Sequence, residues 1–578
     1  MCGTRRRGPN RFVVVLLAAS LVACTGGSPG LHEGGLANAG EFGQGRSAAA
    51  AYLAGRHALE LGRVEEAARY FDRAAAADPL NLELRRQAFL LTVAAGEIDR
   101  GIALARQLLE LEGTTEEARL LLAVVEAKAG RFQAMREHVA RIGGRSPLGG
   151  AAPVLRAWAR AGTGDLEAAL EILERGGRDD PFALPRGYHR AMILAYGGRL
   201  AEARAALAAL EKGDELLPVR VLFAQAALDV RAGERERALA RIDAYRKRAG
   251  DPASLVAIRD RIVRGEEGWL PAADPASGAA DLLLGLADLL REQRVGPQAL
   301  LYARLAAYLT PDAGDVWLAI GRIAQQQEDH AAAIRAYDRV REHSPFHWEA
   351  QLAKASALKD QDKAEEAIAL LRELARRRPE RIDALVQLGD LFRAAERYAE
   401  AGEAYGEAIA RIAEPERQHW RLFYVRGIAL ERTKRWPEAE AAFLKALELQ
   451  PDQPFVLNYL GYSWVEQGIN LERAKAMLHR AVELRPQDGF IVDSLGWAYF
   501  KLGEWDKAVE YLERAVELEP GDPTINDHLG DAYWRVGRHR EARFQWQRAL
   551  GLKPEADALA AINEKLEKGL PEPDARRG

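Results

Sequence analysis

A pair of histidines is the place where this sequence comes nearest to a site for chemistry. His343 and His347 are four residues apart, a spacing that on one helix could hold a metal ion. Pro345 lies between them at a predicted helix end, and proline disrupts a helix interior. We therefore interpret both residues as loop histidines rather than metal ligands.

Motifs of several common catalytic sites are absent. The sequence contains no GxxxxGK[ST], HExxH or CxxC pattern, so phosphate-loop, zincin and thiol-redox chemistry lack their minimum residues. We predict a non-enzymatic protein with no cofactor and no metal site.

A stripe of aromatic and hydrogen-bonding side chains is more informative. Its members lie on three successive predicted helices, on a face about 100° around each helix from the core positions. Aromatic rings beside polar groups are typical of protein- and peptide-binding surfaces, since a ring buries much area at little rotamer cost. The stripe consists of Phe455, Asn458, Tyr462, Phe490, Asp493, Trp497, Asp527, Asp531 and Trp534.

We expect the rings of Phe490, Trp497 and Trp534 to project into solvent, while Leu495 and Leu529 on the adjacent face are buried. The alternative is that neighbouring repeats or a C-terminal cap cover the rings. The aspartates of the stripe predict that a bound segment carries Lys, Arg or a free amine, and that its capture weakens with salt.

A fixed period must position these residues. Leu-Gly recurs at 495–496 and at 529–530, a shift of 34 residues. Apolar residues recur every three or four positions, with no convincing alternating strands, which predicts an all-α chain. Small residues recur in three registers, with a large residue between the last two and a proline after the third. The small residues are Gly427, Gly461, Gly496 and Gly530, then Ala439, Ala474, Ala508 and Ala542, then Ala446, Ala481, Ala515 and Ala549.

This pattern resembles the tetratricopeptide repeat, a unit of two antiparallel helices. The resemblance covers the positions equivalent to Leu495, Gly496 and Tyr499 in one unit, while Val492 and Asn526 replace the opening tryptophan. It implies an all-α superhelical solenoid of antiparallel helix pairs, in two halves, whose first helices line a concave groove.

The organisation of the chain follows from the same marks. Between residues 82 and 263 the alanine registers drift, Gly and Pro interrupt the helical pattern after residue 263, and the last residues suit a solvent-facing cap. We predict a signal peptide at 1–23, a Gly-rich tether at 24–45, a degenerate repeat solenoid at 46–263, a linker at 264–280, a second repeat solenoid at 281–556, and a capping helix with a frayed tail at 557–578.

The N-terminus reads as an export signal. Arginines precede an apolar run at 12–21 that is too short to remain as a membrane span. The ending "LVAC" resembles the lipobox of bacterial lipoproteins, which implies a lipid on Cys24; an ordinary secretory signal is the alternative. Thr25 stands where lipoproteins retained in the inner membrane have Asp, so the resemblance implies delivery to the outer membrane, facing the periplasm.

Charge and cysteine content exclude other classes. The chain has 81 basic and 85 acidic residues, a net charge of −4, and signal removal would take away arginines only. Nucleic-acid binding is therefore disfavoured. Of the two cysteines, Cys2 leaves with the signal and Cys24 would be acylated, so the fold must depend on packing.

The predicted function follows from the resemblance. The chain is similar to proteobacterial lipoproteins with these repeats, and "LNYLGYSWVEQG", "VDSLGWAYFKLG" and "NDHLGDAYWRVGR" look most like adaptors that bring carboxy-terminal processing proteases to envelope substrates. We therefore expect a protein-binding adaptor that docks a periplasmic partner. The alternative is a structural scaffold for exopolysaccharide export or outer-membrane assembly.

Overall fold

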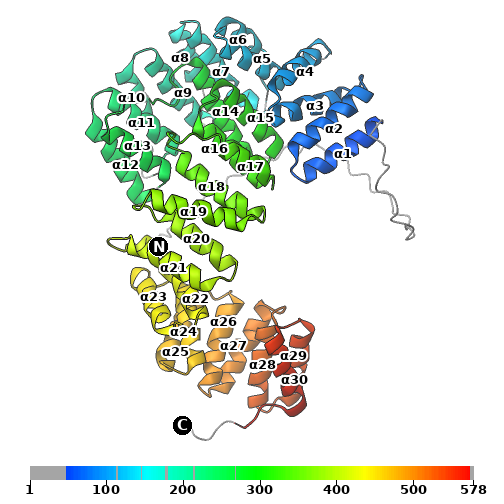
Figure 1. The fold of residues 1–578 in the computed structure, drawn as a ribbon, viewed down its shortest axis with the longest axis vertical. Coiled ribbons are helices and arrows are strands. Elements are labelled where there is room, and N and C mark those ends of the chain that lie inside the picture. Colours follow the sequence, from blue (N-terminus) through cyan, green and yellow to red (C-terminus); the bar gives the residue numbers. More distant parts are fainter. Residues whose placement is uncertain are drawn as a thin grey trace, which may run out of the picture.

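The chain is a solenoid of paired helices. In this computed structural model residues 47–111, 115–144, 146–175, 180–211, 215–250, 252–266 and 269–572 are described, and no strand is assigned within these ranges. The predicted all-α fold is confirmed. Figure 1 shows an upper body followed by a lower body that ends at the C-terminus. The predicted signal peptide and tether, with Cys24, lie outside the described residues.

The upper body contains the first helices of the chain. They are α1 (Ala48–Glu60), α2 (Val64–Ala77), α3 (Leu82–Ala95), α4 (Ile98–Leu111), α5 (Glu116–Lys128), α6 (Phe132–Val139), α7 (Pro147–Gly162), α8 (Leu166–Glu174), α9 (Ala183–Tyr196), α10 (Leu200–Ala208), α11 (Val219–Arg231), α12 (Arg235–Ala249), α13 (Ala253–Val263), α14 (Pro275–Glu292), α15 (Gly296–Leu309), α16 (Gly314–Gln326) and α17 (His330–Tyr337).

The lower body continues the winding. Its helices are α18 (His347–Asp360), α19 (Ala364–Arg377), α20 (Asp383–Ala394), α21 (Tyr398–Ala410), the short η1 (Arg417–His419), α22 (Trp420–Arg432), α23 (Trp436–Leu449), α24 (Pro454–Gln467), α25 (Leu471–Leu484), α26 (Gly489–Lys501), α27 (Trp505–Leu518), α28 (Pro523–Arg535), α29 (His539–Gly551) and α30 (Ala556–Lys568). The last of these is the predicted capping helix.

The small-residue registers allow the two helices of a pair to approach closely. Ala508 and Ala515 on α27 are fully buried. A Cβ placed on Gly496 of α26 would lie 2.7 Å from Leu512 Cγ, and one on Gly427 of α22 would lie 2.5 Å from Phe443 Cε1. Glycine therefore leaves the space that the large residue of the second helix fills, as the repeat pattern predicted.

The turn within a pair uses a left-handed backbone conformation, which ends the first helix. This turn keeps the 34-residue period through the region where the alanine registers drift, so residues 82–249 form five regular helix pairs, α3 to α12. Residues with positive φ recur at Gly62, Gly96, Gly130, Gly164 and Gly198, and again at Arg294, Glu328, Asp362 and Glu396.

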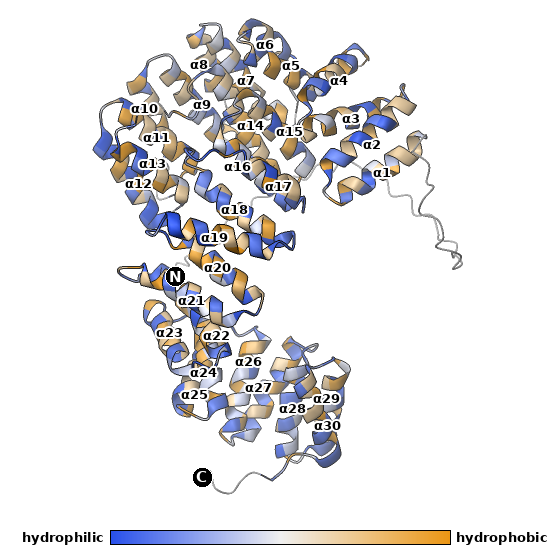
Figure 2. Cartoon of the chain, in the orientation of Figure 1, coloured by the Kyte–Doolittle hydropathy of each residue, from blue (hydrophilic) through white to orange (hydrophobic). Residues whose placement is uncertain are grey.

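The hairpin of α14 and α15 fills the inner face of the upper body. Helix α15 packs on α3 and α5, and α14 packs on α5, α7 and α9, which are the first helices of successive pairs. One buried cluster therefore takes in residues of α1 to α11 and of α14 to α17, while α12 and α13 belong to a separate cluster. Arg335 on α17 also pairs with Glu65 on α2 at 2.7 Å, so the winding returns to its first unit. The long apolar run of α14 lies in the middle of this body in Figure 2.

Residues 264–280 are not the linker that the sequence predicted. Leu270 and Ala272 are buried, and helix α14 begins at Pro275 inside this segment. Asp274 and Ser277 form a capping box at its N-terminus. Proline is favoured in the first turn of a helix, where its missing N–H costs no hydrogen bond. Pro275 thus marks a helix start, and Leu270 and Ala272 pack in the cluster of α14 rather than in that of α13.

A buried polar cluster fixes α14 in position. Arg220 on α11 donates from Nη1 to the carbonyl oxygen of Asp281 at 3.0 Å, and its Nε lies 3.3 Å from Asp281 Oδ1. Burial raises the pKa of Asp281 to about 6, against the opposing effect of Arg220. On α7, Trp158 donates from Nε1 to His189 Nδ1 on α9 at 3.1 Å. Arg220 thus bonds α11 to α14, and the Trp158–His189 bond joins α7 and α9, on both of which α14 packs.

A bulky residue at Gly278 should loosen this hairpin. A Cβ on Gly278 would overlap the indole ring of Trp158. We expect Gly278→Val to destabilise the upper body by about 1–3 kcal/mol through overpacking, with faster amide hydrogen exchange in α7 and α14. Gly143→Ala is the control, because a Cβ there meets nothing within 4 Å. Equal exchange in both variants would contradict the packing described for α14.

Candidate functional site

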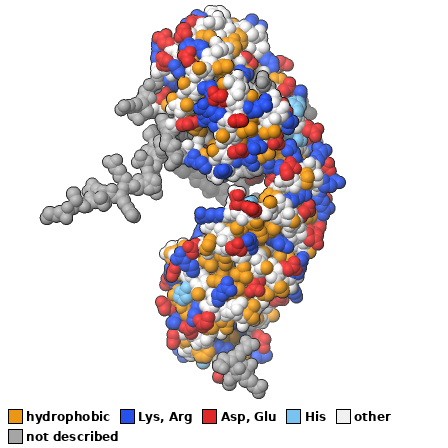
Figure 3. Space-filling view, turned by 90° about the vertical axis from the view of Figure 1, so that its left-hand side faces the viewer, with side chains coloured by type: hydrophobic (Ala, Val, Ile, Leu, Met, Phe, Trp, Pro, Cys, Tyr) orange, Lys and Arg blue, Asp and Glu red, His pale blue; other side chains and the backbone are white. Residues whose placement is uncertain are grey.

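The first helices of the lower body form one layer, called the groove wall here because the repeat resemblance predicts a concave groove along it. Helices α24, α26 and α28 lie side by side, and each also packs on the second helix of its own pair. Figure 3 shows hydrophobic side chains gathered across the lower body between charged groups. The residues of the predicted stripe all lie on these three helices.

Two aromatic rings of this wall are exposed. Phe490 at the start of α26 is 54% exposed and Phe455 at the start of α24 is 38% exposed. The guanidinium of Arg485 lies over the Phe455 ring, 4.7 Å from its centroid. Leu495 and Leu529 are buried. The expectations for Phe490 and for both leucines are therefore confirmed.

Polar side chains follow Phe455 along α24. The side-chain oxygen Oδ1 of Asn458 is buried and has no hydrogen-bond partner among the described residues. Tyr462, one turn further along α24, is half-buried, and burial raises the pKa of its hydroxyl. Asn458 itself is half-buried, so rotation of its side chain would present an amide that can accept from, and donate to, the main chain of another segment.

Trp497 does not project into solvent, and the expectation that it does is wrong. Its indole is 9% exposed and lies between Phe500 and His528, with ring centroids 4.7 Å and 4.0 Å away. Its Nε1 donates to Glu466 on α24. Phe500 of the same helix therefore covers one face of the ring and His528 of the next repeat covers the other, which makes Trp497 a core residue of the α24–α28 wall.

Asp493 is likewise closed off. Both of its carboxylate oxygens lie within 3.0–3.1 Å of His528 Nδ1, and both side chains are buried. Burial disfavours the charged imidazole, but the carboxylates of Asp493, Asp531 and Asp527 outweigh this and raise the pKa of His528. The charge of Asp493 is thus paired within the chain.

The remaining aspartates bind a cation from the chain itself. Lys565 Nζ on α30 lies 2.8 Å from Asp527 Oδ2 and 2.8 Å from Asp531 Oδ2. Asp531 also accepts from Trp546 Nε1 at 2.9 Å. Burial lowers the pKa of Lys565, but the two carboxylates outweigh this and raise it. The ammonium that we expected from a bound segment therefore comes from the capping helix.

Trp534 is partly covered by the end of the chain. Its ring stacks on His539, with centroids 4.2 Å apart, and a Cβ on Gly569 would overlap it. Arg535 Nη1 donates to the carbonyl oxygen of Pro571 at 2.7 Å. The segment after α30 thus folds back over the end of α28, and Trp534 does not project freely as the sequence predicted.

The stripe therefore divides into two parts. The open part, on α24 and the start of α26, comprises Phe455, Asn458, Tyr462 and Phe490. The closed part comprises Asp493, Trp497, Asp527, Asp531 and Trp534, and it is covered by His528, His539, Lys565 and Gly569. The sequence analysis missed His528 and Lys565, although each lies about one repeat after the aspartate that it binds.

The described residues show no group of three or more side chains arranged to hold a metal ion. His343 lies in a turn and His347 is the first residue of α18, with Nδ1 2.9 Å from the carbonyl oxygen of Val340. Among the described helices, none combines the length and apolar character that crossing a bilayer requires.

Comparison with known proteins identifies the repeats. The tetratricopeptide repeat family model matches residues 36–81, 318–382, 352–417, 386–454, 470–523 and 494–557. The chain therefore contains tetratricopeptide repeats, and its helices form a solenoid of that type. The matched residues include α18 to α23 and most of the groove wall.

Relatives are distant. The general transcriptional corepressor ssn6 of Schizosaccharomyces pombe is 25% identical over 138 residues, which are 24% of this chain and only 12% of that protein. The structure of an APC/C hetero-tetramer, Cut9-Hcn1, is 16% identical with a TM-score of 0.35, covering 85% of this chain and 96% of that one. Yeast Tom70 is 13% identical with a TM-score of 0.31, covering 90% and 95%.

Removal of the Lys565 ammonium should lower the stability of the α28–α30 end, because Asp527 and Asp531 lose the cation that they share. Lys565→Met leaves buried Asp531 without its cation, and we expect the α28–α30 end to lose about 2 kcal/mol or more, read as faster hydrogen exchange in α28. Lys568→Met is the matched control on the same helix, since its pair with Glu564 is exposed and such pairs contribute about 0–1 kcal/mol. Similar exchange in the two variants would show that Lys565 is not the cap's anchor.

Proposed function

We propose that this chain of tetratricopeptide repeats is a non-enzymatic scaffold that binds a protein segment in the open part of its lower groove. The observation that carries the proposal is the unpartnered Asn458 oxygen one turn along α24 from the exposed ring of Phe455, with the exposed ring of Phe490 at the start of the neighbouring helix α26. Exposed rings around a polar group match the composition of binding hot spots. The site holds no constellation for chemistry, so binding is the activity it supports.

The upper body supports this choice of groove. Its inner face already packs against α14 and α15, so the first helices α3, α5, α7 and α9 have little free surface for a partner. The lower body has no such internal hairpin among its described helices. The wall of α24 and α26 is therefore the surface that we propose for a partner segment, rather than the inner face of the upper body.

The segment that we propose has an extended main chain and carries no excess of positive charge. The amide of Asn458 offers one acceptor and two donors, which suits the main chain of an extended peptide. The aspartates expected to demand a cation are paired with His528 and Lys565. Apolar side chains of the segment would cover Phe455 and Phe490, and binding should depend little on salt.

The cellular setting of the proposal comes from the N-terminal resemblance. A lipid on Cys24 would anchor the scaffold in the outer membrane and present the groove to the periplasm. The first candidates for partners are a carboxy-terminal processing protease and its envelope substrates. Co-purification from envelopes separates this from the alternative, because an export or assembly scaffold would capture a polysaccharide porin or an assembly factor instead.

Truncation of one exposed ring tests the groove. We expect Phe490→Ala to weaken capture of the envelope partner by about 2 kcal/mol, some thirtyfold in affinity, without lowering thermal stability, because the ring is half-exposed. Phe544→Ala is the matched control, since Phe544 is 61% exposed on α29, a second helix outside the groove wall. Equal loss in both variants, or no loss in Phe490→Ala, would move the binding site elsewhere.

The anchor is tested separately. We expect Cys24→Ser to leave the protein unprocessed or soluble and to shift it out of the outer-membrane fraction, with its circular dichroism unchanged. Fractionation and mass identical to those of the parent protein would contradict lipidation at Cys24.

A further inference from the structure

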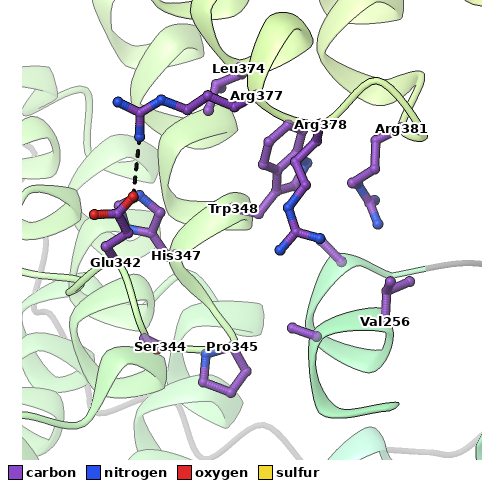
Figure 4. A pocket seen from close by; sticks show the side chains of 12 residues that line it. Val256, Glu342, Ser344, Pro345, His347, Trp348, Leu374, Arg377, Arg378 and Arg381 are labelled. Atoms are coloured by element: carbon purple, nitrogen blue, oxygen red, sulfur yellow. Dashed lines mark hydrogen bonds and ion pairs between the residues drawn. The ribbon is translucent and has the colours of Figure 1, made fainter. Parts of the chain in front are cut away.

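A cleft separates the end of the upper solenoid from the first helices of the lower body. It has a volume of about 410 Å³, within the range of small-ligand pockets, about 300–1,000 Å³. Helix α13 forms one wall, and the start of α18 with the end of α19 forms the other (Figure 4). Its lining includes Ala253, Val256, Ala257, Pro345, Trp348 and Arg378.

The guanidinium of Arg378 has one edge turned away from its carboxylate partners. Figure 4 shows it reaching from the end of α19 toward Val256 on the opposite wall. Its Nη1 lies 3.2 Å from Glu380 and 3.8 Å from Asp260. Among the described residues, its Nε and Nη2 donate to no acceptor, so one edge of the planar group is left for a ligand. Arg377 beside it is occupied by Glu342 and Glu373.

The surroundings hold Arg378 in place. Trp348 donates from Nε1 to Asp383 Oδ2 at 2.9 Å, and Arg381 binds the same carboxylate while lying over the indole ring. Arg411 Nη1 donates to the carbonyl oxygen of Arg378 at 3.4 Å and to that of Arg381 at 3.0 Å. The turn that carries Arg378 is thus fixed before any ligand binds, which lowers the ordering cost of binding.

Shape and charge together select the ligand. The wall from α13 is apolar, contributed by Ala253, Val256 and Ala257. Three arginines and one glutamate, Glu342, line the cleft, but Arg377 is bound by Glu342 and Glu373, and Arg381 by Asp383. The open edge of Arg378 is left for an anion. A single carboxylate can take that edge in a bidentate contact, whereas a phosphate would have no second open guanidinium to balance its further charge.

We propose that this cleft binds a carboxylate carried on an apolar body, with Arg378 holding the carboxylate and the α13 wall holding the apolar part. Two sources have this chemistry: the C-terminal end of a protein chain and a small branched-chain acid. The site lies apart from the α24–α26 groove, so the two proposals stand independently.

Calorimetry on the full chain in lipid nanodiscs tests the proposal. The probes are the acetylated tetrapeptide Gly-Ala-Leu-Val with a free carboxylate, the same peptide as its C-terminal amide, 4-methylpentanoate, and inorganic phosphate. We expect the peptide acid, 4-methylpentanoate or both to bind, and phosphate not to bind. If a protein C-terminus is the ligand, the peptide amide should bind at least about tenfold more weakly than the peptide acid. Binding of 4-methylpentanoate alone would identify the small acid as the source.

Variants assign the contact. Arg378→Met should weaken carboxylate binding about tenfold or more, whereas Arg376→Met should not change it, because Arg376 is exposed on α19 and does not line the cleft. Asp260→Asn should strengthen binding, since it removes the carboxylate that competes for Arg378 across the mouth of the cleft. A gain in affinity cannot come from misfolding.

Three results would overturn the proposal. The first is that neither the peptide acid nor 4-methylpentanoate binds. The second is that the peptide acid and the peptide amide bind equally while 4-methylpentanoate does not bind. The third is that Arg378→Met, with circular dichroism like that of the parent, binds with unchanged affinity.

Discussion

The packing of α14 and α15 into the inner face of the upper body is the interaction on which the rest of the structure depends. A solenoid of helix pairs leaves its concave side uncovered, and here the chain covers that side with its own hairpin. Gly278 permits the contact because Trp158 occupies the space a side chain would need. The upper groove is thereby removed as a surface, and the lower groove and the cleft beside α13 remain.

Most of the fold could be predicted from the repeat period of the sequence. Glycine and alanine registers with a large residue between them demand two close helices, and the structure has them from α18 to α29. Residues 82–249 looked degenerate because their alanines drift. The left-handed turns at Gly96, Gly130 and Gly164 nevertheless keep the period, so the spacing of the glycines predicts the helix pairs where the spacing of the alanines does not.

The groove was harder to predict because exposure depends on residues far along the chain. Helical geometry placed Phe490 and Trp497 on the same face of α26, yet one ring is exposed and the other is covered by His528 of the next repeat. The misread linker has a similar origin. Pro275 and its neighbours have the same composition in a loop and at a helix start, and only the burial of Leu270 and Ala272 distinguishes the two.

The ion pairs of Lys565 also determine how long the solenoid is. Each repeat offers its successor an apolar end and polar groups that need partners, so an uncapped solenoid is a template for further units, including those of a second molecule. With Asp527 and Asp531 neutralised by α30, and with Arg535 bonded to the chain that follows it, a second molecule stacking on this end would have to break charged contacts first. The same lysine that closes the last repeat thus opposes growth of the solenoid into a fibre.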